Sequence, residues 1–154
     1  MYFKNLVFIA IAIIALNVFS GFRHSYDDQE WLAYVNRALN QSYDQSAEPK
    51  LKKAELSLTT DYFIRFRKTY AHDMQEYYSF NLRQFNDIDY MGDINKGVLE
   101  LKTMADDIIV QTYNDRRGDI DSMTTVLPIP VKNMEPDRLD SLRQAFNYFK
   151  AKGM

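Results

Sequence analysis

The chain has 154 residues, with 19 Lys or Arg against 21 Asp or Glu, which gives a formal net charge of −2. This balance argues against a dedicated nucleic-acid binder, because such proteins carry a large basic excess. The sequence has no cysteine and 2 histidines. It therefore excludes disulfides and thiolate zinc sites, leaves almost no room for a multi-histidine metal or haem site, and predicts no cofactor.

The N-terminus carries an apolar segment. Residues 6–18 read LVFIAIAIIALNV, and the wider span runs from Tyr2 to Phe22. As a helix this span would reach about 31 Å, close to the roughly 30 Å hydrocarbon core of a bilayer. We interpret residues 1–23 as a transmembrane anchor. The alternative is a secretory signal peptide that is cleaved after Ser20.

The orientation of this segment is weakly encoded. Lys4 precedes the apolar span and Arg23 follows it, so the positive charges that set orientation are nearly balanced. The additional charge of the α-amino group favours an N-terminus inside the cell. We therefore expect a single-pass protein of the inner (cytoplasmic) membrane, with residues 24–154 in the periplasm or outside the cell.

Residues 24–154 are predicted to fold as one all-α domain. Its first helix starts at Ser25, which forms a sequence resembling a capping box with Asp28 three residues later. Apolar residues then follow at helical spacing: Trp31, Leu32, Val35, Ala38 and Leu39.

A long second helix is predicted after Ser46, its N-cap. Neither Gly nor Pro occurs between Lys50 and Met91, so the helix either crosses a whole bundle or breaks near Asn81. Its apolar and aromatic residues keep spacings of mostly three, four or seven: Leu51, Leu58, Tyr62, Phe66, Tyr70, Met74, Tyr77 and Phe85.

The last third of the chain completes the predicted bundle. A turn at residues 90–93 leads to a third helix that ends before Gly118. Residues 123–134 are expected to be extended, because Pro128 and Pro130 push the residues before them out of the helical region. A last helix begins near Pro136. The prediction is about four helices, with an extended Pro-containing arm before the last one.

Candidate sites for chemistry are few, and each has a simpler structural explanation. His72 and Glu76 could ligate a metal from one helix face, but no further ligands are placed with them. Residues 87–94 resemble the start of a calcium loop that lacks the oxygen donor at position five and the Glu at position twelve. Residues 117–119 spell Arg-Gly-Asp, which a helix stop at Gly118 also explains. Residues 62–70 interleave aromatic residues with cations, which we interpret as a packed face rather than a platform for nucleic acid.

The leading functional hypothesis is a non-catalytic, membrane-anchored accessory or scaffold subunit that docks on a larger assembly. The alternative is an exported soluble helical binding or inhibitor protein, released by cleavage near Ser20; an enzyme ranks third. Expected partners are the membrane and another protein, with no nucleic acid and no identifiable small-molecule substrate. The abundance of Tyr and Phe motivates the protein partner, because tyrosine suits surfaces that are half apolar and half wet.

Two places on the chain are candidates for that contact. One is the outward face of the long helix, at Tyr77 or Tyr78. The other is the arm, where Leu127 and Ile129 either cover the domain as a connector or dock into a partner. The connector interpretation is favoured for the arm.

Overall fold

The computed structural model describes residues 27–153. Within this range a helix, eight strands and a second helix follow one another. The helices are α2 (Asp28–Ser42) and α3 (Pro136–Gly153). The strands are β1 (Leu51–Leu58), β2 (Phe63–Tyr70), β3 (Gln75–Asn81), β4 (Phe85–Gly92), β5 (Lys96–Thr103), β6 (Ile108–Tyr113), β7 (Asp121–Thr124) and β8 (Val126–Lys132). Three short 3₁₀ turns, η1 (Gln45–Ala47), η2 (Ala71–Asp73) and η3 (Leu82–Gln84), lie between them.

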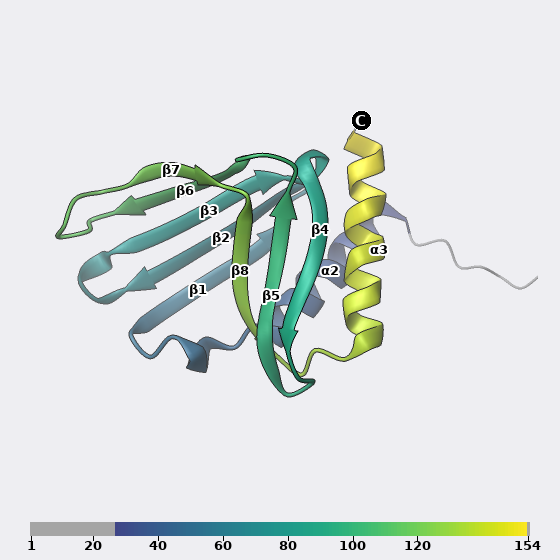
Figure 1. Ribbon diagram of the computed structural model, residues 1–154, viewed down its shortest axis with the longest axis horizontal. Helices are drawn as coiled ribbons and strands as arrows, with labels where there is room; N and C mark the ends of the chain where they lie inside the picture. Colours follow the sequence, from purple (N-terminus) through teal and green to yellow (C-terminus); the bar gives the residue numbers. More distant parts are fainter. Residues whose placement is uncertain (1–26, 154) are drawn as a thin grey trace, which may run out of the picture.

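The strands form two antiparallel sheets in a β-sandwich-like arrangement. The larger sheet has the order β1-β2-β3-β6-β7, and the smaller has the order β4-β5-β8. The smaller sheet crosses in front of the larger one, and both helices lie on one side of the molecule (Figure 1). On the opposite side, the larger sheet ends in the β2–β3 and β6–β7 loops (Figure 1).

The prediction of an all-α helical bundle is wrong. The segment assigned to the long second helix forms β1, β2, β3 and β4, and the segment assigned to the third helix forms β5 and β6. A spacing of four residues fits one face of a helix, but it also fits one face of a strand, where every second side chain points the same way. In β2, Ile64, Phe66 and Lys68 are buried whereas Arg65 and Arg67 between them are exposed, which is the strand period.

The two terminal helices and the extended arm agree better with the sequence. α2 starts at Asp28 rather than at Ser25, which lies outside the described residues. Its N-cap is Asp27, whose carboxylate accepts the Glu30 N–H at 2.8 Å while Glu30 Oε2 accepts the Asp27 N–H at 3.1 Å. The predicted last helix is confirmed as α3. The predicted extended segment forms the end of β7 and all of β8, and the extended chain stops at Lys132 because Asn133 has a φ of 51°.

The transmembrane prediction finds no counterpart in the described part of the chain. None of the helices in residues 27–153 combines the length and apolar character needed to span a bilayer. The predicted span itself, residues 1–23, lies outside the residues that the structure describes.

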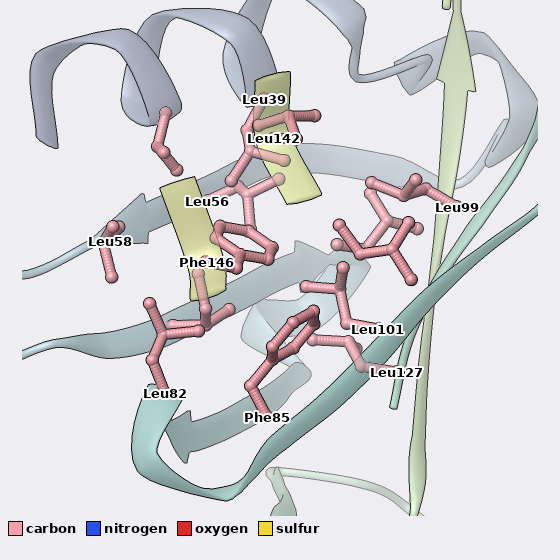
Figure 2. Packing of buried hydrophobic residues seen from close by; sticks show 14 of the residues in the cluster. Leu39, Leu56, Leu58, Leu82, Phe85, Leu99, Leu101, Leu127, Leu142 and Phe146 are labelled. Atoms are coloured by element: carbon pink, nitrogen blue, oxygen red, sulfur yellow. The ribbon is translucent and has the colours of Figure 1, made fainter. Parts of the chain in front are cut away.

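One apolar core joins the two sheets and the two helices. Leu39 from α2 and Leu142 and Phe146 from α3 pack against strand residues of both sheets (Figure 2). The core therefore fills the half of the larger sheet nearest the helices. Its strand residues in the close view are Leu56, Leu58, Phe85, Leu99, Leu101 and Leu127.

The start of α2 is tied to the end of α3. The Asp28 carboxylate accepts a hydrogen bond from the Tyr148 hydroxyl at 2.5 Å and pairs with the Lys152 ammonium. The hydrogen bonds from Lys152 and Tyr148 hold the pKa of Asp28 below its usual range. The two ends of the described domain thus meet at one place.

Candidate functional site

The inner face of the larger sheet changes from apolar to charged with distance from the helices. The strand register aligns Leu58, Ile64 and Phe80 in one row. The next row is Leu56, Phe66, Tyr78 and Val110, and the one beyond it is Ala54, Lys68, Glu76 and Thr112. We call this last set the charged row. The apolar core of the sheet therefore ends at the charged row, where the inner face carries polar and charged side chains.

Lys68 is the buried centre of the charged row, with a relative exposure of 7%. Its ammonium lies 2.5 Å from Glu48 Oε1 and 3.8 Å from Glu76 Oε2. It also lies over the rings of Phe66 and Tyr78, 5.0 and 5.7 Å from their centroids. Two carboxylates and one ammonium therefore share one partly buried cluster, whose formal charge is one negative.

Three tyrosine hydroxyls surround this cluster. Tyr43 donates to Glu48 at 3.0 Å, Tyr70 donates to Glu76 at 3.2 Å, and Tyr78 donates to Glu76 at 3.5 Å. Burial, reinforced by the neighbouring carboxylates, raises the pKa of Tyr43 and Tyr70 above the usual range and that of Tyr78 to about 12. The three phenols therefore stay protonated near neutral pH and act as hydrogen-bond donors.

A cleft of about 530 Å³ opens beside the charged row, at the end of the sheet opposite the helices. Its half-buried lining comes from Tyr70, Met74 and Glu76 on β2, β3 and the turn between them, and from Asp115 in the β6–β7 loop. Its exposed lining carries three cations, Lys50, Arg116 and Arg117, and the His72 imidazole. The cleft thus has apolar contact surface from the Tyr70 ring and the Met74 side chain, and basic side chains around its border.

The two loops that border the cleft are held in defined conformations. Asn114 Nδ2 of the β6–β7 loop donates to the Asp73 carbonyl of the β2–β3 loop at 3.1 Å. His72, Asp73 and Asn114 have φ values of 59°, 58° and 58°, in the left-handed region that residues other than glycine adopt infrequently. His, Asp and Asn are the residue types other than glycine that enter this region most readily, so these values fit tight turns at both loops.

Two of the three cations at the border have no carboxylate partner within residues 27–153. Arg117 Nε lies 3.7 Å from Asp115 Oδ1, a carboxylate that also accepts the Arg117 N–H at 2.9 Å. Lys50, His72 and Arg116 have no carboxylate partner among the described residues. Glu76 is engaged by Lys68 and two tyrosines, so it supplies little free negative charge to the cleft.

Comparisons with known protein families, curated proteins and solved structures find no match for this chain. The arrangement of charges and apolar surface around the cleft is therefore the basis for assigning a function.

The four residues predicted to contact a partner do not converge on one surface. Tyr78 lies on the inner face in contact with the Phe66 ring, whereas Tyr77 lies on the outer face, with Arg67 stacked 5.5 Å from its centroid. Leu127 and Ile129 lie in β8 and are 0% exposed, so a partner cannot reach them in this conformation. The long helix expected to present the two tyrosines is strand β3 instead.

The other motifs noted in the sequence lie mostly in turns and loops of the sheets. His72 lies in the β2–β3 loop and Glu76 in β3, and no group of three or more potential metal ligands occurs in the described part. In the segment resembling a calcium loop, the Asp93 carboxylate accepts the N–H groups of Asn95 and Lys96 to form a turn. The Arg-Gly-Asp tripeptide lies in the exposed β6–β7 loop.

The sequence does not indicate Lys50, Glu48 or Arg116 as site residues. Lys68 was considered only as one of the cations in residues 62–70, and Arg117 only as part of the Arg-Gly-Asp tripeptide. One signal for Lys68 was present in the sequence. The alternation of Ile64, Phe66 and Lys68 with Arg65 and Arg67 places Lys68 on the apolar face of a strand, where an ammonium requires partners.

Proposed function

We propose that residues 27–153 form a non-catalytic binding domain that acts as an accessory subunit of a larger assembly. The partner protein docks at the cleft between the β2–β3 and β6–β7 loops. One observation carries this proposal: the cations Lys50 and Arg116 border a cleft of about 530 Å³ without a carboxylate partner among the described residues. Uncompensated charge around a concave, partly apolar surface is typical of a site that a partner completes.

The scaffold around the cleft supports a binding role. The cleft stands on strands of one sheet, and Asn114 joins the two loops that border it. A site built on strands and on connected loops changes little when the partner arrives, which lowers the conformational cost of association.

The chemistry of the neighbouring groups supports a role without catalysis. Tyr70 and Tyr78 have raised pKa values and donate to Glu76. A phenol in this state is a poor general base near neutral pH. Glu76 in turn is occupied by Lys68 and these hydroxyls, so the polar groups of the cluster stabilise each other.

We place this domain on the outer side of the cytoplasmic membrane on the sequence of residues 1–23 alone. The binding proposal itself concerns residues 27–153 and is the same whether residues 1–20 are retained or removed.

A second candidate function is an exported carrier of a small ligand. The volume of the cleft, about 530 Å³, falls in the range of roughly 300–1,000 Å³ that is common for small-molecule sites. The two candidates differ in what occupies the cleft, a segment of protein or a free molecule.

Site-specific photocrosslinking in cells tests the proposal. A photoreactive residue replaces the exposed His72 in the full-length protein, and a matched protein carries it at Arg37, on the exposed surface of α2. We expect one discrete protein adduct from position 72, absent from position 37 and lost when Lys50→Glu is added. A bound small molecule in native mass spectrometry, without a protein adduct, would favour the carrier instead. Identical adducts from both positions would contradict a specific docking site at the cleft.

A further inference from the structure

We infer that the cleft binds an acidic segment of the partner whose carboxylates lie against Lys50 and Arg116 and whose apolar side chains lie against Tyr70 and Met74. This inference rests on the proposed function and specifies the chemistry of the partner. It follows from charge, from the apolar lining and from the way the nearby carboxylates are already used.

The positive charge comes from two separate parts of the chain. Lys50 directly precedes β1, whereas Arg116 and Arg117 belong to the loop between β6 and β7. Neither Lys50 nor Arg116 has a carboxylate partner within residues 27–153. A ligand that supplies one carboxylate to each would bridge the two parts of the border with charge-assisted hydrogen bonds.

The carboxylates near the cleft do not cancel this charge. Asp115 is 11% exposed at its side chain and is directed to Arg117, 3.7 Å from its Nε. Glu76 faces Lys68 at 3.8 Å and accepts hydrogen bonds from Tyr70 and Tyr78. Among the residues that line the cleft, the three cations Lys50, Arg116 and Arg117 exceed the two carboxylates Glu76 and Asp115 by one charge. An acidic ligand therefore complements the lining better than a basic one.

The apolar part of the cleft lining favours a ligand that has apolar groups as well as negative charge. Tyr70 and Met74 are half-buried and face the cleft together with the charged border. The Tyr70 hydroxyl is directed to Glu76, which leaves the ring as contact surface. Aromatic rings and methionine thioethers contact apolar side chains adaptably, as at many protein interfaces.

A peptide fits this surface better than a nucleic acid does. Asp73 and Asp119 are exposed in the same two loops that carry the cations, and they would repel a continuous phosphate backbone. An acidic peptide can place its carboxylates on Lys50 and Arg116 and turn neutral residues towards these aspartates.

Fluorescence anisotropy of defined peptides on the full-length protein tests the inference. The probes are labelled octapeptides of alternating Asp and Leu, alternating Asn and Leu, and alternating Lys and Leu, with an octathymidylate as the nucleic-acid probe. The protein variants are Lys50→Glu with Arg116→Glu, Met74→Ser, and the control Arg37→Glu on α2. The double variant reverses two charges at the cleft, whereas the control reverses one charge at the other end of the molecule.

We expect the Asp-Leu peptide to bind at least tenfold more tightly than the Asn-Leu and Lys-Leu peptides. Its affinity should fall about tenfold in the double variant and severalfold in Met74→Ser, and should stay within twofold in Arg37→Glu. Raising NaCl from 50 to 300 mM should weaken it.

Three results would overturn the inference: equal affinity for acidic and neutral peptides, unchanged affinity in the double variant, or tighter binding of the octathymidylate. Far-ultraviolet circular dichroism of each variant shows whether it has folded. If the acidic peptides do not bind but the crosslink at position 72 is still formed, the inference about acidic segments is wrong and the docking proposal stands. If the peptides bind but no partner crosslinks, the docking proposal is wrong.

Discussion

Replacing Lys68 by Met tests how the charged row is held together. Lys68 is 8% exposed at its side chain and lies 2.5 Å from Glu48 and 3.8 Å from Glu76. Methionine retains most of the length of the side chain and removes its charge. The two carboxylates are then left near each other without the ammonium that both face.

The structure sets the expected size of this effect. Removing one partner of a fully buried ion pair costs about 3–5 kcal/mol. Glu48 and Glu76 are 21% and 27% exposed, so water compensates part of this loss, and three tyrosine hydroxyls still donate to them. Loss of the cation–π contact with Phe66 adds about 0.5–1 kcal/mol. We expect the free energy of unfolding to fall by about 3 kcal/mol.

Urea denaturation followed by circular dichroism measures the effect. With a slope of about 2 kcal/mol/M, the unfolding midpoint should fall by roughly 1.5 M. Adding Glu48→Gln and Glu76→Gln to Lys68→Met should restore the free energy of unfolding to within about 1 kcal/mol of the original, because no unpaired charge remains. Lys53→Met is the matched control: its pair with Glu55 is 65% and 50% exposed and should contribute less than about 1 kcal/mol.

Two results would refute this reasoning. A midpoint for Lys68→Met within experimental error of the unchanged protein would mean that the cluster contributes nothing to stability. A triple variant as unstable as the single one would mean that Lys68 matters through packing and not through charge.

Three further predictions follow from burial and protonation. Phe66→Asp, which places a carboxylate at a side chain that is 0% exposed, should lower the free energy of unfolding by about 4 kcal/mol or more; an unchanged thermal midpoint would show that Phe66 is not a core residue. The double change Leu127→Ser with Ile129→Ser should lower the thermal midpoint by about 15 °C or more, whereas Met123→Ser, at a residue that is 56% exposed, should leave it within about 3 °C. Raised pKa values in the folded state predict loss of stability in alkali: the contribution of Tyr78 is fully present below pH 10, the ordinary phenol pKa, and is lost as the pH rises to about 12. Urea midpoints measured from pH 9 to 11.5 should fall less steeply in Tyr78→Phe than in the unchanged protein, and equal slopes would contradict the assignment.

The sequence predicts the two ends of the domain better than its middle. Periodic apolar residues identify α2 and α3, because a helix of 15 or 18 residues repeats its pattern over several turns. Pro128 and Pro130 identify an extended segment for a local steric reason. These signals are contained within each segment, so no knowledge of the rest of the fold is needed.

Strands β1, β2 and β3 were missed because the turns between them lack the usual residues. Tyr62 and His72 take up positive φ values of 65° and 59° in the β1–β2 and β2–β3 turns, where Gly or Asn would ordinarily signal a hairpin. Without that signal, aromatic residues four apart fit a helix and a strand equally well. Tertiary pairing, which the local sequence does not reveal, decides between them.

The cleft was inaccessible to sequence reasoning for a different reason. Asp73 and Asn114, whose contact joins its two borders, are 41 residues apart. Lys50 and Arg116 become neighbours of one cleft through strand order, since β3 pairs with β6 while β4 and β5 belong to the other sheet. The cations at the cleft come together only through this strand order, so no short sequence motif indicates them.

The contact of Asp28 with Tyr148 and Lys152 places both ends of the described chain on the side of the domain opposite the cleft. The described chain enters and leaves at this contact, beside the helices, while the β2–β3 and β6–β7 loops lie at the far end of the larger sheet (Figure 1). A surface or fusion partner attached through either end of the domain would leave the cleft directed away from it. Affinity tags or immobilisation at residues 27 or 153 should therefore preserve binding, and insertions at the β6–β7 loop should abolish it.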